Sequence, residues 1–361
     1  MYFKNTFKNK KVLVTGHSGF KGSWLAEWLQ ILGAKTYGIS KDIPTKPSHF
    51  KILNLKKKTR THMFDLRKSN LLTKKIKLIE PDFIFHLAAQ SLVKKSYDDP
   101  VTTWQSNLIS TLNLLESLRH TKKKITVVII TSDKCYLNDD KKKSYKENDI
   151  LGGIDPYSAS KASCEILINS YVKSFFNSKQ HNINICSARA GNVIGGGDWS
   201  LDRLIPDYVK SWKNKNKLKI RGIKSTRPWQ HVLEAISGYL TLADQLSRNR
   251  KLHGHSFNFG PLHKKNFTVN DVLKGLSKYL SGVKYKVKKN KKFKESNLLS
   301  LNSNKAKKHL SWKPNLTFNQ TIEFVGNWYK NFYLNKKIIT KSQIILYQTI
   351  AKRKKLNWTK A

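Results

Sequence analysis

Residues 11–33 read KVLVTGHSGFKGSWLAEWLQILG, and this stretch decides the fold. Residues 11–15 are typical of a short buried strand, and the apolar positions that follow recur at helical spacing up to Gly33. Between the two lies the pattern G-x-x-G-x-x-G, formed by Gly16, Gly19 and Gly22. Glycines at this place permit a tight turn, close approach to a pyrophosphate and close packing of helix on strand. The stretch therefore predicts a dinucleotide site at a helix N-terminus.

The alternation of strand and helix continues downstream. Further strands are predicted at residues 36–39, 61–66, 83–88, 125–131 and 183–188, and helices at residues 71–79, 101–118 and 157–176. Apolar runs without polar alternation, separated by amphipathic helices, indicate a parallel sheet covered on both faces. We therefore expect an α/β protein with a Rossmann-like, doubly wound parallel sheet and a smaller α/β substrate-binding domain.

A tyrosine and a lysine share one face of the helix predicted at 157–176. Positions i and i+4 are neighbours on a helix, so Lys161 lies one turn from the Tyr157 phenol. A free phenol titrates near pH 10, and a fixed cation nearby lowers that pKa. Tyr157 could then take the proton from a substrate hydroxyl while hydride leaves the carbon. Because this spacing also occurs by chance, the glycine turn is what makes it informative.

Ser132, Asp133 and Lys134 follow the strand predicted at 125–131. An acid and a candidate base beside an alcohol-oxidising pair suggest that oxidation is only a first step. To act as an acid near pH 7, Asp133 needs a pKa raised by burial, whereas Lys134 would have to lose its proton. A plain ion pair between the two would give the opposite protonation states. An anchoring role for Lys134, or proton exchange within a coupled pair, therefore stays open.

The adenosine end of the cofactor site is less clearly marked. The acid expected about 20 residues beyond the glycine turn is not clearly placed, because the second strand ends at Ser40 and Lys41 and the first acid is Asp42. Ser40 could bond the ribose of NAD, whereas Lys41 could favour the 2′-phosphate of NADP. Asp65 ends the next strand, where an adenine ring would lie. We interpret His86 as a buried, hydrogen-bonded core residue.

Several longer motifs carry a family resemblance. They are VTGHSGFKGSW, PDFIFHLAAQSLVKKSYDDP, TSDKCY, DPYSASKASCE, SARAGNVIGGGDWSLDRLIPD, STRPWQHVLEAISGYL and FNFGP. Over about residues 8–332 the chain resembles the extended short-chain dehydrogenases/reductases, also called the NAD-dependent epimerase/dehydratase family. Within it, TSDKCY and RAGNVIGGGDW resemble the branch that dehydrates nucleotide hexoses. Enzymes of that branch that act on dTDP-glucose or GDP-mannose carry Glu at the position of Lys134, so the resemblance implies CDP-glucose as substrate and NAD as cofactor.

The resemblance also implies residue roles. Tyr157 takes the C4 hydroxyl proton, Ser132 bonds the C4 oxygen, Asp133 is the acid and Lys134 the base, with Lys161 completing the catalytic set. The implied cofactor-binding residues are Gly16, His17, Gly19, Phe20, Gly22, Ser40, Asp65, Leu66, Leu87, Ala88, Ala89, Asn107, Tyr157 and Lys161. The implied substrate-binding residues are Gln90, Asn192, Gly197, Asp198, Trp199, Arg203 and Arg227, among which arginine suits a diphosphate because its planar fork binds phosphate oxygens bidentately.

Domain organisation and location follow from the same comparison. We expect an NAD-binding domain at residues 1–190, a nucleotide-sugar-binding domain at 191–334 with segments that interchange between lobes, and a basic C-terminal tail at 335–361 that forms a peripheral helix and a solvated end. Relatives pair subunits through helices equivalent to 101–118 and 157–176, which implies a homodimer or homotetramer. No apolar stretch reaches the roughly 20 residues that span a bilayer, and the N-terminus does not resemble a secretion signal, so we expect a cytoplasmic protein without a membrane partner.

The net charge of +46, from 69 basic and 23 acidic residues, fits the resemblance least well. It favours an acidic partner, yet the lysines are spread along the whole chain and aromatic residues are not interleaved with the basic runs. We therefore expect no specific nucleic acid and only non-specific binding at low salt. Three distant cysteines without a C-x-x-C pair predict neither a metal site nor a disulfide. The alternatives are another dehydratase or epimerase of the same family and, remotely, a basic nucleic-acid-binding protein.

Overall fold

The central feature of the protein is a parallel β-sheet. The computed structural model describes residues 2–138, 144–178, 181–220, 222–261, 267–287 and 300–360. Within them, seven parallel strands lie in the order β12-β7-β5-β4-β1-β2-β3. Their bounds are β1 Lys11–Thr15, β2 Lys35–Ser40, β3 Arg60–Met63, β4 Phe83–His86, β5 Ile125–Ile130, β7 Ile183–Ala190 and β12 Ser256–Phe259. The order reverses between β1 and β4, which is where such sheets bind ligands at their carboxyl ends.

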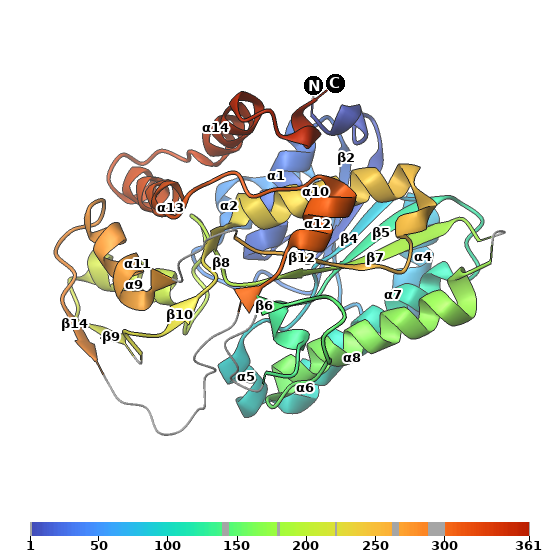
Figure 1. The fold of residues 1–361 in the computed structure, drawn as a ribbon, viewed down its shortest axis with the longest axis horizontal. Coiled ribbons are helices and arrows are strands. Elements are labelled where there is room, and N and C mark those ends of the chain that lie inside the picture. The colour runs from blue at the N-terminus through green and yellow to red at the C-terminus, as the bar shows by residue number, and fades with distance from the viewer. Residues whose placement is uncertain are drawn as a thin grey trace.

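Helices cover both faces of this sheet (Figure 1). One face carries α1 Phe20–Ile31, α10 Val232–Arg248, α12 Asn304–Leu310 and α14 Thr340–Arg353. The other carries α4 Ser69–Ile79, α7 Ser110–Leu118 and α8 Pro156–Tyr171, and two π-helical turns, Gln105–Ile109 and Val172–Phe176, extend α7 and α8. A separate hydrophobic core fills each side. The predicted fold class, a doubly wound parallel sheet, is confirmed.

Shorter elements make up the rest of the described chain. Helices α9 Leu204–Asn214 and α11 Val269–Ser277 lie beside the paired strands β9 Leu218–Ile220 and β14 Tyr285–Val287, away from the main sheet (Figure 1). The remaining pairs are β8 Val193–Ile194 with β11 Gln230–His231, β10 Thr226–Arg227 with β13 Phe267–Thr268, and β6 Ser144–Tyr145 with β15 Ser300–Leu301. The other helices are α2 His49–Ile52, α3 Leu55–Lys58, α5 Val93–Asp98, α6 Pro100–Trp104 and α13 Phe318–Tyr333. Helix α10 and strand β12 return to the main sheet, and both a domain boundary at residue 190 and the interchange of segments between lobes stay predictions.

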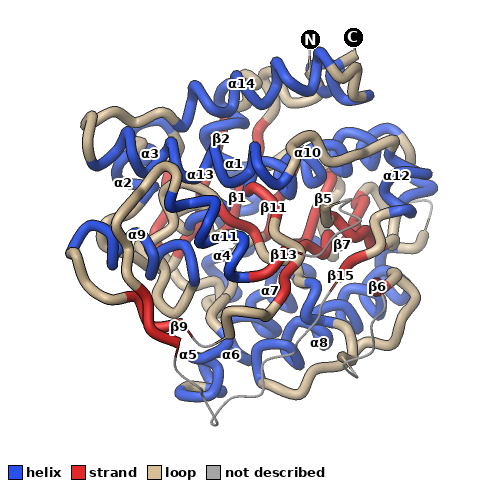
Figure 2. Tube along the Cα trace, turned by 60° about the vertical axis from the view of Figure 1, so that its left-hand side comes forward, coloured by secondary structure: helices blue, strands red, loops and turns tan. Residues whose placement is uncertain are grey.

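The C-terminal segment is packed onto the body of the protein. The peripheral helix expected there is α14, but the solvated end is not found: Trp358 is only 4% exposed. Its ring stacks on Phe3, with centroids 4.9 Å apart, and on Tyr347 of α14. Figure 2 shows the two chain ends side by side above α1. The expectation of a solvated end was wrong. The exposed basic residues at 352–355 suggested a solvated segment, although the residues of α14 that precede them form an apolar face that is buried.

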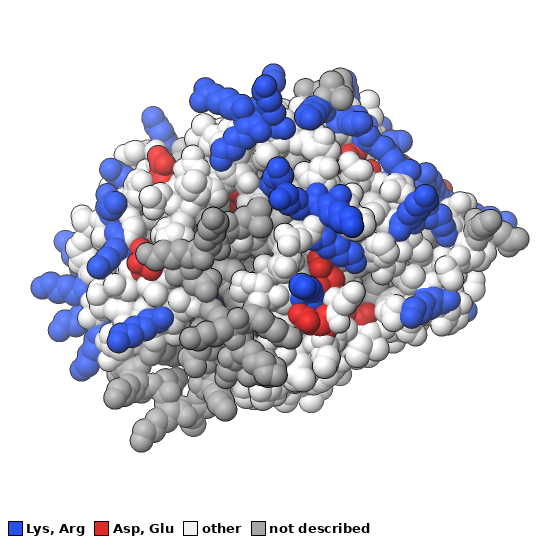
Figure 3. Space-filling model, in the orientation of Figure 1, with Lys and Arg blue, Asp and Glu red and all other residues white. Residues whose placement is uncertain are grey.

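Basic side chains are distributed over the surface. In Figure 3, lysines and arginines are scattered over the visible face, with few acidic residues among them and no single dense cluster. The described residues contain no group of three or more histidine, cysteine or acidic side chains placed to bind a metal. Among the helices described, none combines the length and the apolar character that a membrane span requires.

Candidate active site

The turn that follows β5 holds the predicted acid. Ser132 caps a short 3₁₀ helix, Asp133–Cys135, and its hydroxyl accepts from the Lys134 backbone amide at 3.2 Å while donating to Asp133 Oδ1 at 3.0 Å. Asp133 is 3% exposed, and burial raises the pKa of its carboxyl. Its Oδ2 has no hydrogen-bond partner among the described residues. A buried carboxyl with one free oxygen is suited to hold a proton and to donate it.

Helix α8 brings Tyr157 and Lys161 to the same place. Its N-terminus is fixed by Asp155, whose carboxylate accepts from the Ser158 backbone amide at 2.9 Å and from the Ser158 hydroxyl at 2.6 Å. Lys161 Nζ donates to the carbonyl oxygen of Ile130, the last residue of β5, at 3.4 Å. Helix and strand therefore hold Tyr157 and Lys161 beside the turn that carries Ser132.

Tyr157 is buried beside Ser132. Burial raises the pKa of Tyr157 to about 12, although a hydrogen bond with Ser132 acts in the opposite direction. Lys161 is itself buried, and burial lowers the pKa of its own ammonium. A lowering of the Tyr157 pKa by Lys161 stays a prediction.

The glycine turn has the predicted geometry. Gly16 has a φ of 72°, and a side chain there would come within 2.8 Å of the Ala88 backbone. A Cβ on Gly22 would lie 2.2 Å from the Gly16 carbonyl oxygen, so helix α1 can approach β1 only with glycine at this position. Gly19 caps α1, and Phe20 begins it. An anion at this helix end would meet free backbone amides and the positive end of the helix dipole.

Two of the predicted cofactor residues support this turn. His17 Nδ1 and Ser40 Oγ are 2.8 Å apart, and Ser40 Oγ accepts from the Ser18 backbone amide at 3.1 Å. His17 Nε2 also lies 3.1 Å from the Thr61 hydroxyl, and burial lowers the pKa of the ring to about 4. Both side chains therefore hold the loop in place, and a contact of Ser40 with the ribose stays a prediction.

The region predicted to hold the adenine contains a carboxylate in an open pocket. Asp65 accepts from Arg67 Nε at 2.9 Å and NH2 at 2.7 Å, and Lys41 Nζ lies 3.7 Å away. Burial acts against ionisation of Asp65, but Arg67 outweighs it and lowers the pKa of the carboxyl. Asp65 and Arg67 line a cavity of about 420 Å³ together with Lys68, Gln105 and Ile109. Neighbouring Leu66 is buried, and its carbonyl oxygen accepts from Asn113.

The loop after β4 is held by an amide network. Leu87, Ala88 and Ala89 form its half-buried start. Asn107 accepts from the Gln90 backbone amide at 2.8 Å and donates to the Ser160 hydroxyl on α8 at 2.9 Å. The Gln90 side chain bonds Leu92 and Thr103, so both amides have internal partners. The interpretation of His86 as a core residue is confirmed: it is 2% exposed, and its ring nitrogens lie within hydrogen-bonding distance of the Thr15 and Thr111 hydroxyls.

The glycine run at 195–197 packs against aromatic rings. A Cβ on Gly196 would lie 1.9 Å from the Trp328 ring, and one on Gly197, whose φ is 81°, would lie 2.5 Å from the His49 ring. The Trp24 indole on α1 donates to the Gly196 carbonyl at 2.9 Å. These glycines are therefore required for packing, and a contact of Gly197 with substrate stays a prediction. The Trp199 indole donates to the Tyr333 hydroxyl at 3.0 Å, which fixes this side chain on α13.

A buried carboxylate orients one of the predicted phosphate-binding arginines. Asp198, only 3% exposed, accepts from Arg203 NH1 at 3.2 Å, and Arg203 NH2 donates to the Ser91 hydroxyl at 3.1 Å. Arg203 thus bridges the loop at 195–199 and the loop after β4. Arg227 donates to the Thr226 carbonyl, and the backbone carbonyl of Asn192 accepts from Gln230. Their contacts with substrate stay predictions.

Sequence reasoning missed Lys21. This residue lies in the first turn of α1, and burial together with the positive charges of Lys161 and Arg203 lowers the pKa of its ammonium to about 8, while Asp133 acts in the opposite direction. The glycine turn and the catalytic turn therefore share one electrostatic environment. The available signal was the position of Lys21 inside the glycine pattern, directly before Gly22.

With this geometry in place, the chain can be compared with known proteins. The family model described as GDP-mannose 4,6 dehydratase matches residues 13–325. The chain belongs to this family. A curated relative, CDP-glucose 4,6-dehydratase of Salmonella typhimurium, is 40% identical over 334 residues, which are 91% of this chain and 93% of the relative.

Solved structures with the same fold include an epimerase and a dehydratase. The UDP-glucuronic acid 4-epimerase of Bacillus cereus, solved with UDP-glucuronic acid and NAD, has a TM-score of 0.77 and 25% identity, covering 90% of this chain and all of the other. The dTDP-glucose 4,6-dehydratase of Bacillus anthracis, solved with NAD, has a TM-score of 0.73 and 22% identity over 91% of this chain and 99% of the other. The same fold therefore occurs in an epimerase and in a dehydratase.

Proposed function

We propose that this protein is a CDP-glucose 4,6-dehydratase, which converts CDP-glucose to CDP-4-keto-6-deoxyglucose and water. The observation that carries the proposal is the buried Asp133, with its raised pKa and a free carboxyl oxygen, in the turn between Ser132 and Lys134. An epimerase or reductase needs only Ser132, Tyr157 and Lys161. The identity to the Salmonella enzyme supports the choice of CDP-glucose.

The glycine turn would hold NAD, which would supply a hydride acceptor for C4 of the glucose unit and, once reduced, a hydride donor for C6. The chain's own groups move the protons. Tyr157 takes the proton of the C4 hydroxyl as C4 is oxidised to a ketone, and the Ser132 hydroxyl donates a hydrogen bond to that oxygen. The ketone acidifies C5, so Lys134 removes the C5 proton while Asp133 protonates the C6 hydroxyl, which leaves as water. The proton taken from C5 returns there after C6 has been reduced, and the proton that Tyr157 takes from the C4 hydroxyl replaces the one that Asp133 gives to the leaving water, so atoms and electrons balance.

The cofactor site fits NAD. The glycine turn leaves backbone amides at the start of α1 for the pyrophosphate, and the cavity at Asp65 lies at the carboxyl end of β3. Lys41, which could favour NADP, pairs instead with Asp65. A 2′-phosphate placed there would meet this carboxylate, so we assign NAD. The relatives of known structure that were solved with NAD support the assignment.

We further propose that the enzyme is a homodimer or a dimer of dimers that works in the cytoplasm. The helices predicted to pair subunits carry exposed apolar side chains: Val101 is 64%, Ile109 38%, Ile166 59% and Phe175 40% exposed. A second copy of the chain would cover them. Sedimentation that shows only a 41.7 kDa species at micromolar concentration would contradict this assembly.

Purified protein incubated with NAD and a panel of nucleotide glucoses tests the proposed function. We expect CDP-glucose to give the alkali-dependent chromophore of a 4-keto-6-deoxy sugar, and dTDP-, UDP- and GDP-linked hexoses to give little. Tyr157→Phe is the control, because it removes the phenolic base and should abolish the chromophore. Turnover of none of these sugars by the wild type would refute the proposal.

A further inference from the structure

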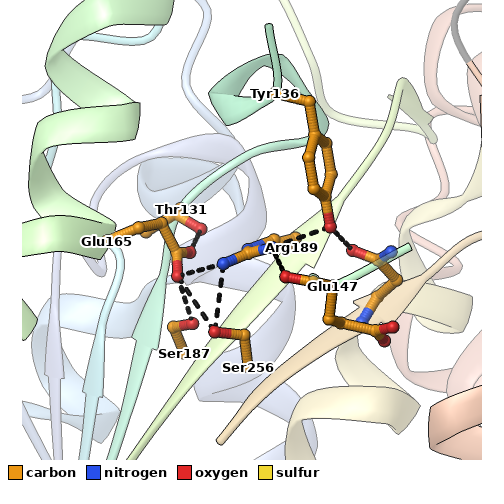
Figure 4. A network of polar contacts seen from close by, with 8 residues as sticks. Thr131, Tyr136, Glu147, Glu165, Ser187, Arg189 and Ser256 are labelled. Atoms are coloured by element: carbon orange, nitrogen blue, oxygen red, sulfur yellow. Dashed lines mark hydrogen bonds and ion pairs between the residues drawn. The ribbon is translucent and has the colours of Figure 1, made fainter. Parts of the chain in front are cut away.

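Beneath the catalytic turn lies an ion pair that the mechanism does not use. Arg189 on β7 and Glu165 on α8 meet at 2.7 Å between NH2 and Oε2, and their side chains are only 3% and 2% exposed (Figure 4). Removing two charges from water costs several kcal/mol, so a buried pair is weak evidence for stability alone. Its purpose must be sought in the groups that it binds.

The carboxylate holds the residue before the turn. The Thr131 hydroxyl donates to Glu165 Oε1, and Thr131 directly precedes Ser132. Glu165 Oε2 also accepts from Ser187 at 2.7 Å and from Ser256 at 3.2 Å, so it is fixed to β7 and β12 at once. In Figure 4 these three hydroxyls converge on one carboxylate.

The guanidinium holds the residue after the turn. Arg189 NH1 donates to the Tyr136 hydroxyl at 2.8 Å and to the Glu147 carbonyl at 3.0 Å. The Tyr136 hydroxyl in turn donates to Asn258 Oδ1 at 2.7 Å, and the ring stacks on Tyr145 with centroids 5.1 Å apart. Tyr136 directly follows Cys135, the last residue of the 3₁₀ helix.

The pair therefore holds both ends of the segment Ser132–Cys135. Glu165 also lies one helical turn after Lys161 on α8, so the same carboxylate fixes the helix that carries Tyr157. We propose that Glu165 and Arg189 are positioning residues, which hold the acid-bearing turn in register with the catalytic helix. This inference rests on the proposed function, because the alignment of turn and helix affects catalysis only if their residues transfer protons at C4, C5 and C6.

The test removes one anchor at a time and leaves the ion pair intact. Tyr136→Phe and Thr131→Val should each lower kcat for the nucleotide sugar by about 10- to 100-fold, because small displacements of catalytic groups are costly. KM should change by less than about twofold, since the substrate-binding loop is untouched. Thr131→Ser restores the hydroxyl and should restore most of kcat.

The matched control is Asp244→Asn, which weakens another ion pair outside the catalytic turn, in which a buried Asp244 meets the exposed Arg248 and the Thr6 hydroxyl. It should lower stability without lowering kcat. Unchanged kcat in both Tyr136→Phe and Thr131→Val would overturn the inference and leave the pair a structural role. If the wild type turned over no nucleotide glucose, the proposed function would fail. Crystal structures would then decide the inference: a displaced turn in Tyr136→Phe supports it, and an unmoved turn overturns it.

Discussion

Glu165 and Glu234 are both buried carboxylates, yet their pKa values move in opposite directions. Burial opposes the ionisation of Glu165, but the charge of Arg189 and several hydrogen bonds outweigh it and lower the pKa. Glu234, on α10, is 2% exposed and accepts only from neutral donors, the backbone amides of Asn315 and Leu316 and the hydroxyl of Tyr347. Burial raises the pKa of Glu234 to about 7 in spite of these bonds and of the positive charge of Lys354.

The difference teaches what a buried carboxylate needs in order to stay charged. Neutral donors satisfy its oxygens, but only a cation in direct contact, as Arg189 is with Glu165, compensates for the loss of water. We call the region around the turn Ser132–Cys135 the catalytic edge. There Glu165 stays ionised, so it can hold Arg189 and Thr131 and, through them, the turn. We call the region around α14 the C-terminal edge. There Glu234 joins α10 to α14 by hydrogen bonds whose strength depends on pH.

The largest expected effect comes from removing the cation in contact with Glu165, which leaves this carboxylate, like Glu234, with hydrogen bonds from neutral donors alone. Arg189→Leu leaves the carboxylate buried without its cation, which should lower the free energy of unfolding by about 3–5 kcal/mol. Urea denaturation monitored by tryptophan fluorescence measures the loss. The double variant Glu165→Leu with Arg189→Leu removes both charges and should recover most of it. A single variant as stable as the wild type would show that the pair does not set the state of Glu165.

The next effect is a pH dependence at Glu234. Its folded pKa, about 7, lies above the unfolded value of 4.5, so the folded state binds the proton more tightly. The contribution of Glu234 to stability is therefore full below pH 4.5 and decreases as the pH rises through 7, by on the order of 3 kcal/mol. Denaturation between pH 5 and 8 should show this decrease in the wild type and not in Glu234→Gln.

The carboxylate at the catalytic edge supplies the control for that series. The folded pKa of Glu165 is lowered, so its contribution is present above the unfolded value and is lost only as the pH falls through the folded one. Glu165→Gln should therefore differ from the wild type by a constant amount between pH 6 and 8. Equal slopes for Glu234→Gln and the wild type would mean that Glu234 keeps its charge when buried.

The smallest expected effect is a change in KM, with little change in kcat, when a contact at the C-terminal edge is removed. The Thr340 hydroxyl on α14 accepts from the Trp328 indole at 2.9 Å and lies 2.9 Å from His49 Nε2, and those two rings pack against Gly196 and Gly197. Thr340→Val should cost about 1 kcal/mol of stability and raise KM for the nucleotide sugar severalfold with little change in kcat.

Thr349, on the same helix, is the matched control, because its exposed hydroxyl bonds only the Ile345 carbonyl one turn earlier. Thr349→Val should leave both KM and stability within error of the wild type. A fall in kcat for Thr340→Val, with KM unchanged, would contradict the expectation that the C-terminal edge affects substrate binding and the catalytic edge affects kcat.

Local sequence patterns predicted the sheet, the glycine turn and the grouping of Ser132, Asp133, Tyr157 and Lys161, because strand order and helical spacing bring such residues together. The pairing of Glu165 with Arg189 could not be predicted, since contacts between a helix and a strand 24 residues apart leave no periodic signal. The raised pKa of Tyr157 depends on burial, which composition does not reveal. The C-terminal packing did leave a signal: buried Ile344, Tyr347 and Ala351 recur at helical spacing among the lysines.

The central claim is that one sugar is oxidised at C4 and reduced at C6 by the same bound cofactor, with the protons moved by Tyr157, Lys134 and Asp133. CDP-glucose deuterated at C4 tests it most directly. The account predicts a product with deuterium at C6 of the same molecule, no net formation of NADH, and no exchange of label when deuterated and unlabelled substrates are mixed. Deuterium retained at C4 would show that the alcohol is never oxidised and would contradict the account.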